Sequence, residues 1–149
     1  MREQEKLVET LKPYPDGSEL TEVLWKTLIG NLTFSKSPAR DDYRAFDAHI
    51  KRDQIPAKEQ DMAREFIDAV RRKLRSRRLA TTKIGYLAAV PEASVVGDWV
   101  CMLHGARHLF VLRENQRNFV YMGPTYVHGL MQGEVLRADW YEKRTLSLV

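Results

Sequence analysis

The sequence is 149 residues long, which suits one domain or one compact unit of two subdomains that share a core. With 24 basic and 20 acidic side chains the net charge is +4, so the chain is only mildly basic and a general nucleic-acid binder is not favoured. The single cysteine, Cys101, excludes an intramolecular disulfide and a cysteine-based zinc site, and its apolar neighbours predict a buried, inert thiol. No apolar run forms a signal core or approaches membrane-spanning length, so we expect a cytoplasmic protein.

Apolar residues recur every three or four positions through the first half of the chain, which is the spacing of helices that bury one face. This pattern predicts four helices, at 3–12, 19–29, 42–53 and 56–75, and a polar, mobile or cleavable loop at 31–40. Ser18 is the expected N-cap of the second helix, and Gly30 is expected to end it. Asp41 or Asp42 is expected to cap the third helix, and Pro56 suits the first turn of the fourth.

Six basic residues gather where the fourth helix ends: Arg71, Arg72, Lys73, Arg75, Arg77 and Arg78. Such a cluster either contacts phosphate groups or forms a solvated face, where cations are favoured at the C-terminal end of the helix dipole. No aromatic residues alternate with these cations, as a binder of single-stranded nucleic acid requires. We therefore favour the solvated face, and we expect Asp68 to pair with Arg72 one turn further along the helix.

From Leu79 onward short apolar runs are broken by glycine, asparagine and aspartate turns, a pattern typical of an antiparallel sheet. The runs predict strands at 79–88, 98–104, 108–114, 118–122, 125–128 and 145–149, with a short element at 133–137. Both faces of 98–104 are largely apolar, so we expect this strand to be covered on both sides. The prediction is therefore an α+β fold in which a helical subdomain, 1–78, packs on a small closed or nearly closed antiparallel β-barrel, 79–149, as one compact unit.

Four residues of the second half form the candidate catalytic set: Tyr126, His128, Arg113 and Glu134. Tyr126 and His128 alternate onto the same face of one strand. Arg113 supplies a positive charge, and Glu134 follows a glycine turn. These groups suffice for proton transfer on a small molecule at one end of the barrel. A wider set adds Asp98, His104 and Tyr121.

The same residues also fit purely structural roles. Asp98 suits a turn, and Arg113 can form a buried pair with Glu134. Tyr126 and His128 can each bond a backbone carbonyl. The histidines are too scattered for a metal site, and the sequence contains neither a nucleophile elbow nor a glycine-rich phosphate loop, so we expect no metal and no other cofactor.

The run Tyr126-Val127-His128-Gly129, followed by Met131 and Gly133-Glu134, is the most specific part of a longer series of spaced residues. The series also includes Gly97-Asp98, Gly105, Val111-Leu112-Arg113, Tyr121 and Gly123, with Trp25–Asn31 upstream. It resembles the C-terminal barrel region of fungal heterokaryon-incompatibility (HET) proteins, over most of residues 18–149. The chain departs from that pattern at Pro124, where those proteins commonly carry an acidic residue, so a site built on that acid is not expected here.

The resemblance implies an accessory or interaction module that binds a protein partner or a small organic ligand, and that can form a homo-oligomer. The domain that names those proteins lies N-terminal to the barrel and is not in this sequence, so the chain is either an excised region or a stand-alone relative; Met1 at the start of a predicted helix favours the second. The alternative hypothesis is a small enzyme of fungal secondary metabolism, of the lyase, isomerase or cyclase type, that uses the acid/base residues at the barrel mouth. A third is nucleic-acid binding through Arg71–Arg78.

Overall fold

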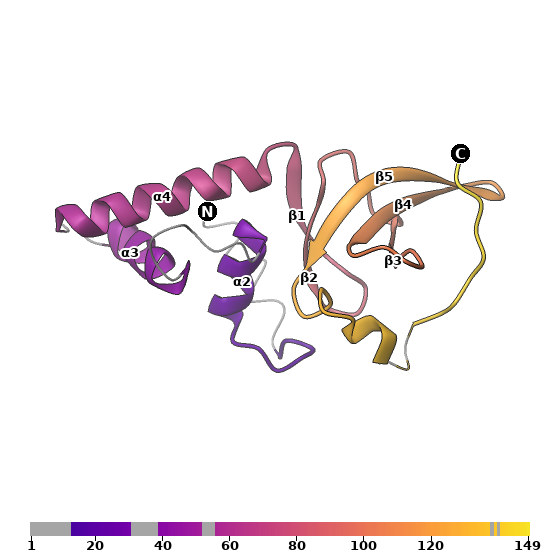
Figure 1. Ribbon diagram of the computed structural model, residues 1–149, viewed down its shortest axis with the longest axis horizontal. Coiled ribbons are helices and arrows are strands. Elements are labelled where there is room, and N and C mark those ends of the chain that lie inside the picture. Colours follow the sequence, from indigo (N-terminus) through magenta and orange to yellow (C-terminus); the bar gives the residue numbers. More distant parts are fainter. Residues whose placement is uncertain (1–12, 31–38, 52–55, 138, 140) are drawn as a thin grey trace.

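The computed structural model describes residues 13–30, 39–51, 56–137, 139 and 141–149, and it confirms the predicted α+β fold. The helices gather at one end of an elongated molecule, and the antiparallel sheet lies at the other (Figure 1). The helix predicted at 3–12 lies outside the described residues, as does the loop predicted at 31–40 apart from its last two positions. Within the described ranges no helix has the length and apolar character needed to cross a bilayer.

Helix α2, Leu20–Ile29, connects the helical end to the sheet, because its apolar side contacts both α4 and β2. Val23 and Leu28, spaced for one helix face, are buried in this contact. Gly30 ends the helix as predicted: it adopts the left-handed conformation (φ +62°), and its N–H bonds the carbonyls of Lys26 and Thr27.

Two capping predictions are wrong. Ser18 lies one residue before the N-cap position, and its N–H instead donates to Oδ1 of Asp16 (2.8 Å) in the turn that precedes the helix. Helix α3, Ala39–Lys51, begins before Asp41 and Asp42, so both residues lie inside its first turn. Aspartates are favourable in a first turn as well as at a cap, which is why the sequence pattern does not separate the two positions.

Helix α4, Ala57–Leu74, matches the helix predicted at 56–75, and Pro56 occupies its N-cap position. Aromatic side chains join α4 to α3. The rings of Phe46 and Phe66 lie 4.9 Å apart between centroids, and both side chains are buried. The two helices therefore bury one shared face, as their apolar spacing predicts.

Five strands form one antiparallel sheet in the order β1-β2-β5-β4-β3. They are β1 (Arg77–Thr81), β2 (Leu87–Pro91), β3 (Trp99–Met102), β4 (Leu109–Asn115) and β5 (Asn118–Val127). The single strand predicted at 79–88 is a hairpin instead, with Leu79 of β1 opposite Ala89 of β2 and a turn between the strands. Gly85 in that turn adopts φ +88°, which glycine tolerates, and the apolar run around it conceals the turn from a pattern analysis.

The two strands predicted at 118–122 and 125–128 are one strand, β5, which carries a bulge. Tyr121 lies opposite Leu112 of β4, but the next pair joins Gly123 to Val111, so Met122 is an extra residue. Residues 118–125 pair with β4, and the last two residues of the strand pair with β2. The bulge therefore lies a few residues before the point, between Thr125 and Tyr126, where β5 passes from β4 to β2.

The sheet is open, so the predicted closed or nearly closed barrel is only loosely matched. β1 and β3 are the two edges, and no pairing between them occurs among the described residues. The strand predicted at 145–149 contributes a single parallel bridge between Leu148 and Phe119 of β5. The element at 133–137 is a short 3-10 helix, η1 (Glu134–Arg137). Closure depends on strand tilt and stagger, which the apolar pattern does not encode.

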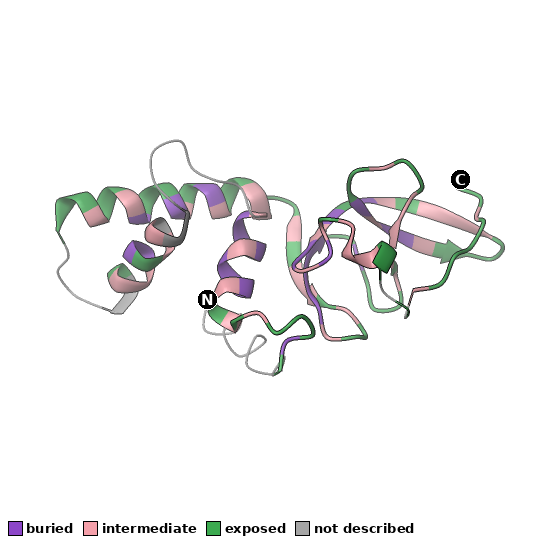
Figure 2. Ribbon diagram, turned by 60° about the horizontal axis from the view of Figure 1, so that its bottom comes forward, coloured by how far each residue is buried: buried purple, intermediate pink, exposed green. Residues whose placement is uncertain are grey.

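One hydrophobic core runs through both parts of the molecule. It includes Leu28 of α2, Phe66 of α4, Leu87 of β2 and Val127 of β5. Figure 2 shows the buried residues concentrated on α2 and on the neighbouring strands. The subdomain boundary predicted after residue 78 falls inside β1.

Candidate functional site

A tyrosine hydroxyl joins the segment before α2 to the sheet. Tyr14 donates a hydrogen bond to the carbonyl oxygen of His128 (2.9 Å) and accepts one from the N–H of Leu87 (3.1 Å). The N–H of His128 donates to the carbonyl oxygen of Leu87 (3.1 Å). Because Ala88 and Val127 are the last paired residues at this end of β2 and β5, the hydroxyl extends their hydrogen-bonded ladder by one step. The segment that carries Tyr14 is therefore fixed at the point where β2 meets β5.

Tyr126 and His128 lie on the same face, as strand alternation predicts. The hydroxyl of Tyr126 is 3.3 Å from Nδ1 of His128. His128 is only 7% exposed, and this burial lowers its pKa, while burial raises the pKa of Tyr126. Both side chains are therefore neutral at physiological pH.

Four aromatic side chains surround these contacts: Tyr14, Tyr86, Tyr126 and His128, here called the tyrosine–histidine cluster. The ring of Tyr14 lies 5.6 Å from that of Tyr86 and 5.7 Å from that of His128, between centroids. Burial raises the pKa of the Tyr14 hydroxyl, which keeps it protonated and able to donate. The cluster thus packs as a set of neutral rings that seal the contact between the segment before α2 and the sheet.

Two carboxylates, Asp16 and Glu134, border the cluster. Burial is the main cause that raises the pKa of Tyr86, and the negative charges of these two carboxylates raise it further. They also oppose the fall that burial causes in the pKa of His128. Oε2 of Glu134 accepts a hydrogen bond from the N–H of Gln132 (2.6 Å). Three of the four predicted site residues therefore belong to this region.

Arg113 does not join the cluster. It lies opposite Val120 in β5, roughly 20 Å along the strand from Tyr126. The predicted pair between Arg113 and Glu134 is also wrong, because Arg113 binds Asp98 instead. The sheet is open and β4 is long, so residues from its two ends do not converge on one mouth.

Asp98 and Arg113 form a two-pronged ion pair, here called the Asp98–Arg113 clamp. Nε and Nη2 of the guanidinium donate to Oδ1 (2.8 Å) and Oδ2 (2.9 Å) of the carboxylate. Nη2 also donates to the carbonyl oxygen of Ala93 (2.8 Å), and Oδ2 accepts from the N–H of Val95 (2.9 Å). The clamp therefore holds the loop between β2 and β3 against β4.

Replacement of Asp98 by asparagine is expected to lower the free energy of unfolding by about 1–2 kcal/mol at neutral pH. Arg113 and the N–H of Val95 hold the pKa of Asp98 below its usual range, so the ionised carboxylate stabilises the folded state. A lowered folded pKa means that this stability is present above the ordinary pKa and is lost as the pH falls through the folded pKa. Chemical denaturation should therefore show the difference between Asp98→Asn and the wild type narrowing below about pH 4. A difference that does not change with pH would contradict the clamp.

The wider candidate residues also lie apart from the cluster. Tyr121 is exposed and packs its ring against Phe110, with centroids 5.6 Å apart. His104 is exposed in the turn between β3 and β4. Sequence reasoning missed Tyr14 and Asp16. The one local signal is that Tyr14 stands between two prolines, which restrict the backbone on both sides.

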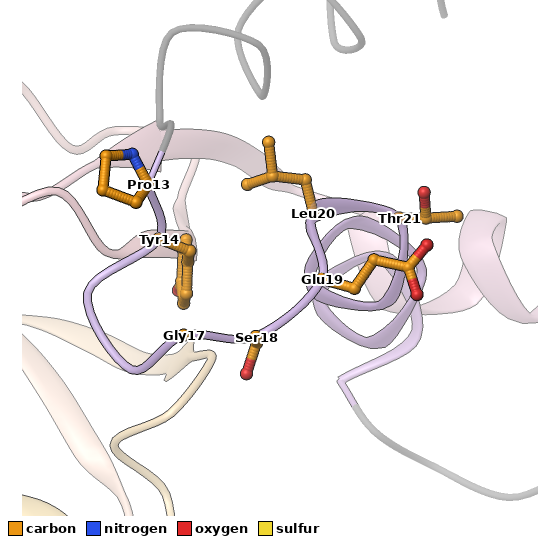
Figure 3. A pocket seen from close by; sticks show the side chains of 7 residues that line it. All are labelled: Pro13, Tyr14, Gly17, Ser18, Glu19, Leu20 and Thr21. Carbon is orange, nitrogen blue, oxygen red and sulfur yellow. The ribbon is translucent and has the colours of Figure 1, made fainter.

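A shallow depression of about 390 Å³ lies beside the cluster (Figure 3). It is lined by residues of one continuous segment: Pro13, Tyr14, Gly17, Ser18, Glu19, Leu20 and Thr21. None of the four predicted site residues lines it. Within the described residues no group of three histidine, cysteine, aspartate or glutamate side chains could hold a metal ion. The depression therefore lacks the acid/base pair that the enzyme hypothesis requires.

The strand predicted at 98–104 to be covered on both sides is only partly covered: Trp99 is exposed, the other residues of β3 are half-buried, and β3 forms one edge of the sheet. Trp99, the first residue of β3, is 41% exposed, and the guanidinium carbon of Arg144 lies 5.2 Å from the centroid of its ring. Val95 and Val96 in the preceding loop are exposed, and Val96 is fully so. These three apolar side chains and the outward backbone of β3 are here called the β3 edge.

Cys101 in the middle of β3 is half-buried, with Sγ 3.7 Å from the carbonyl oxygen of Phe110. Burial raises its pKa to about 11. The thiol is therefore protonated at neutral pH, and it is half-buried where the sequence predicts a buried one.

Several members of the basic cluster bond to the chain itself. Arg71 pairs with Asp68 at 3.6 Å, where the sequence predicts Arg72. Arg77 donates to the carbonyl oxygens of Ala89 and Pro124 in two neighbouring strands, and Arg78 donates to that of Glu92. The cations at the start of β1 therefore bond the sheet itself, which the prediction of a solvated helix face did not include.

The fold and the site define an α+β protein in which helices pack on an open five-stranded antiparallel sheet, with a tyrosine–histidine cluster between them. The chain belongs to the Het-6 beta-barrel domain family, whose match covers residues 20–149. This confirms the resemblance to the barrel region of HET proteins, and it leaves Tyr14 and Asp16 just before the matched residues. No curated protein and no solved structure matches the chain.

Proposed function

We propose that this chain is a protein-interaction module and that its docking surface is the β3 edge. The observation that supports the proposal is an exposed apolar tip, Val95 and Val96, beside an exposed tryptophan on a strand at the edge of the sheet. Adjacent exposed apolar side chains favour contact with another protein, and tryptophan is the residue most enriched among those that dominate binding energy.

The rigidity of the tip also supports the proposal. The Asp98–Arg113 clamp fixes the loop through the N–H of Val95 and the carbonyl of Ala93. The N–H of Asp98 also donates to the carbonyl of Val95 (3.2 Å), which closes the turn that presents Val96. A surface that is already ordered loses less conformational entropy on binding.

The acid/base enzyme hypothesis has weaker support. The pair that favours it, Tyr126 and His128, is in hydrogen-bond contact, but His128 is buried. Arg113 is engaged elsewhere by Asp98, and the depression near Tyr14 contains none of the predicted catalytic groups. A catalytic group must reach its substrate, so the geometry favours the interaction module.

The experiment is an affinity capture from the source cells with matched surface variants. Trp99→Lys puts a charge on the β3 edge, and Ile84→Lys puts the same charge on an equally exposed site (46%) in the turn between β1 and β2. Proteins that bind the β3 edge should be recovered with the wild type and Ile84→Lys and be lost with Trp99→Lys. Equal recovery with all three baits would overturn the proposal.

A further inference from the structure

We infer that residues 141–149, here called the 141–149 strap, compete with the protein that docks at the β3 edge, because Arg144 of the strap occupies the face of the Trp99 ring. The inference rests on the proposed function, since it assigns a regulation to that same surface. The strap comes after η1 in the chain and reaches the hairpin between β4 and β5 (Figure 1). A protein that binds the ring of Trp99 therefore has to displace Arg144.

Two aromatic residues that the strap contacts lie on one face of the sheet. Trp99 of β3 is opposite Leu112 of β4, and Phe119 of β5 is opposite Glu114 of β4. Leu112 and Glu114 are two positions apart on one strand, so all four side chains point to the same face. The rings of Trp99 and Phe119 meet edge to face, with centroids 6.4 Å apart. Arg144 therefore covers one member of an aromatic pair, and Trp99 is still 41% exposed beside it.

The strap touches the sheet through its backbone and through one guanidinium. The N–H of Phe119 donates to the carbonyl oxygen of Ser147 (2.8 Å), and the N–H of Val149 donates to the carbonyl oxygen of Phe119 (3.0 Å). The guanidinium carbon of Arg144 lies 5.2 Å from the centroid of the Trp99 ring. The strap is thus held at β5 by two backbone hydrogen bonds to a single residue, and at β3 by a cation–π contact.

The neighbouring charges distinguish Arg144 from the cation beside it. Glu142 is the main cause that raises the pKa of Arg144, and the charge of Glu114 in β4 raises it further. A carboxylate of the sheet therefore attracts Arg144 in addition to the ring of Trp99. Lys143 lies over Tyr141 within the strap instead, with Nζ 6.0 Å from the ring centroid.

The strap is built to open without unfolding the sheet. Only Tyr141 and Leu146 are half-buried, and its other residues are exposed. Segments that bury little apolar surface and whose hydrogen bonds are exposed open at a low cost in free energy. A cation over an exposed aromatic ring shifts such an equilibrium by about two- to fivefold. Arg144 therefore sets how often the strap is closed.

The closed strap lowers the affinity of the β3 edge for its partner. Only molecules with an open strap present the free ring of Trp99, so the apparent affinity falls with the fraction that is open. Removal of the Arg144 guanidinium should therefore strengthen docking. If Arg144 were instead part of the docking surface, its removal would weaken docking, so the sign of the effect separates the two roles.

The test combines amide exchange with the capture experiment, and it uses the whole chain. Arg144→Ala removes the cation from Trp99, and Lys143→Ala removes the same charge from the neighbouring position. Exchange of the Phe119 amide, whose N–H bonds Ser147, should accelerate by about two- to fivefold in Arg144→Ala and stay unchanged in Lys143→Ala. Recovery of the proteins that Trp99→Lys loses should rise by a similar factor with Arg144→Ala as bait.

The outcomes separate this inference from the proposed function. Unchanged exchange at Phe119 in Arg144→Ala overturns the inference, as does an equal effect of Lys143→Ala. Recovery that stays equal or falls with Arg144→Ala also overturns it, while the β3 edge remains a docking surface. If neither the wild type nor Arg144→Ala recovers a protein that Trp99→Lys loses, the proposed function is overturned and the inference with it. Faster exchange together with higher recovery, in Arg144→Ala alone, supports the inference.

Discussion

An alanine at Gly129 is expected to lower the free energy of unfolding by about 2–4 kcal/mol. Gly129 has φ +84°, a conformation that side-chain-bearing residues rarely adopt. A Cβ at this position would overlap the carboxylate of Asp16 and lie 3.2 Å from Cε1 of Tyr86. The substitution therefore adds backbone strain to a clash at the contact between the segment before α2 and the sheet. Urea denaturation monitored by circular dichroism measures the change.

A matched control separates the two contributions. Gly133 has the same φ, +84°, but a Cβ there would meet nothing within 4 Å. Gly133→Ala should therefore report backbone strain alone, about 1–2 kcal/mol. Removal of the carboxylate by Asp16→Ala should bring the cost of Gly129→Ala close to that value. If Gly129→Ala costs no more than Gly133→Ala in the wild-type background, the close approach of Asp16 to Gly129 is contradicted.

Loss of the Tyr14 hydroxyl in Tyr14→Phe is expected to destabilise the protein by about 2–3 kcal/mol. The change removes a donor to the carbonyl of His128 and an acceptor for the N–H of Leu87, and it leaves both backbone groups buried. Thermal and urea unfolding measure the loss. Amide exchange at Leu87 should also accelerate, because its N–H no longer has a partner.

Tyr121→Phe is the control for the chemical change itself. Tyr121 is exposed on β5, so removal of its hydroxyl should alter stability by less than about 0.5 kcal/mol. An effect of Tyr14→Phe as small as that of Tyr121→Phe would show that the hydroxyl of Tyr14 does not hold the ladder between β2 and β5.

The contact between the segment before α2 and the sheet is separate from the β3 edge. Tyr14, Gly129 and His128 lie where the segment before α2 meets β2 and β5, whereas Trp99 lies at the outer edge of the sheet. Variants of Tyr14 and Gly129 should change stability and leave binding at the β3 edge of the folded protein unaltered. Variants of the β3 edge should do the reverse. Tyr126 and His128, the most distinctive residues of the family resemblance, contact each other and pack beside Tyr14.

Much of the fold follows from local pattern. The apolar spacing in 56–75 gives α4 to within a residue at each end, and Gly30 ends α2 as predicted. The errors in the predicted strand boundaries have local causes. Gly85 turns the chain inside an apolar run, and the bulge at Met122 keeps β5 continuous across a glycine and a proline that usually mark a break.

Local sequence pattern predicted the candidate site less well than it predicted the helices and strands. Alternation places Tyr126 and His128 on one face, because that relation spans only two residues of one strand. The grouping with Arg113 assumes a closed barrel whose strand ends converge, and the open sheet removes that assumption. Asp98, read as a turn residue, does occupy a turn, but its carboxylate also anchors Arg113. A local sequence pattern indicates that a residue is buried, but it does not indicate which distant residue it contacts.

By itself the sequence determined α2 and α4, the positions of β3 and β4, and the family. Only the tertiary structure decided that Tyr14 reaches His128 across a sequence separation of 114 residues, that Arg113 binds Asp98, and that β3 is left as an open edge. Helices and turns arise from interactions between residues a few positions apart, so their signals lie close together in the chain. Strand order, register and bulges arise from contacts between distant segments, and a shift of one residue in register moves every side chain to the opposite face.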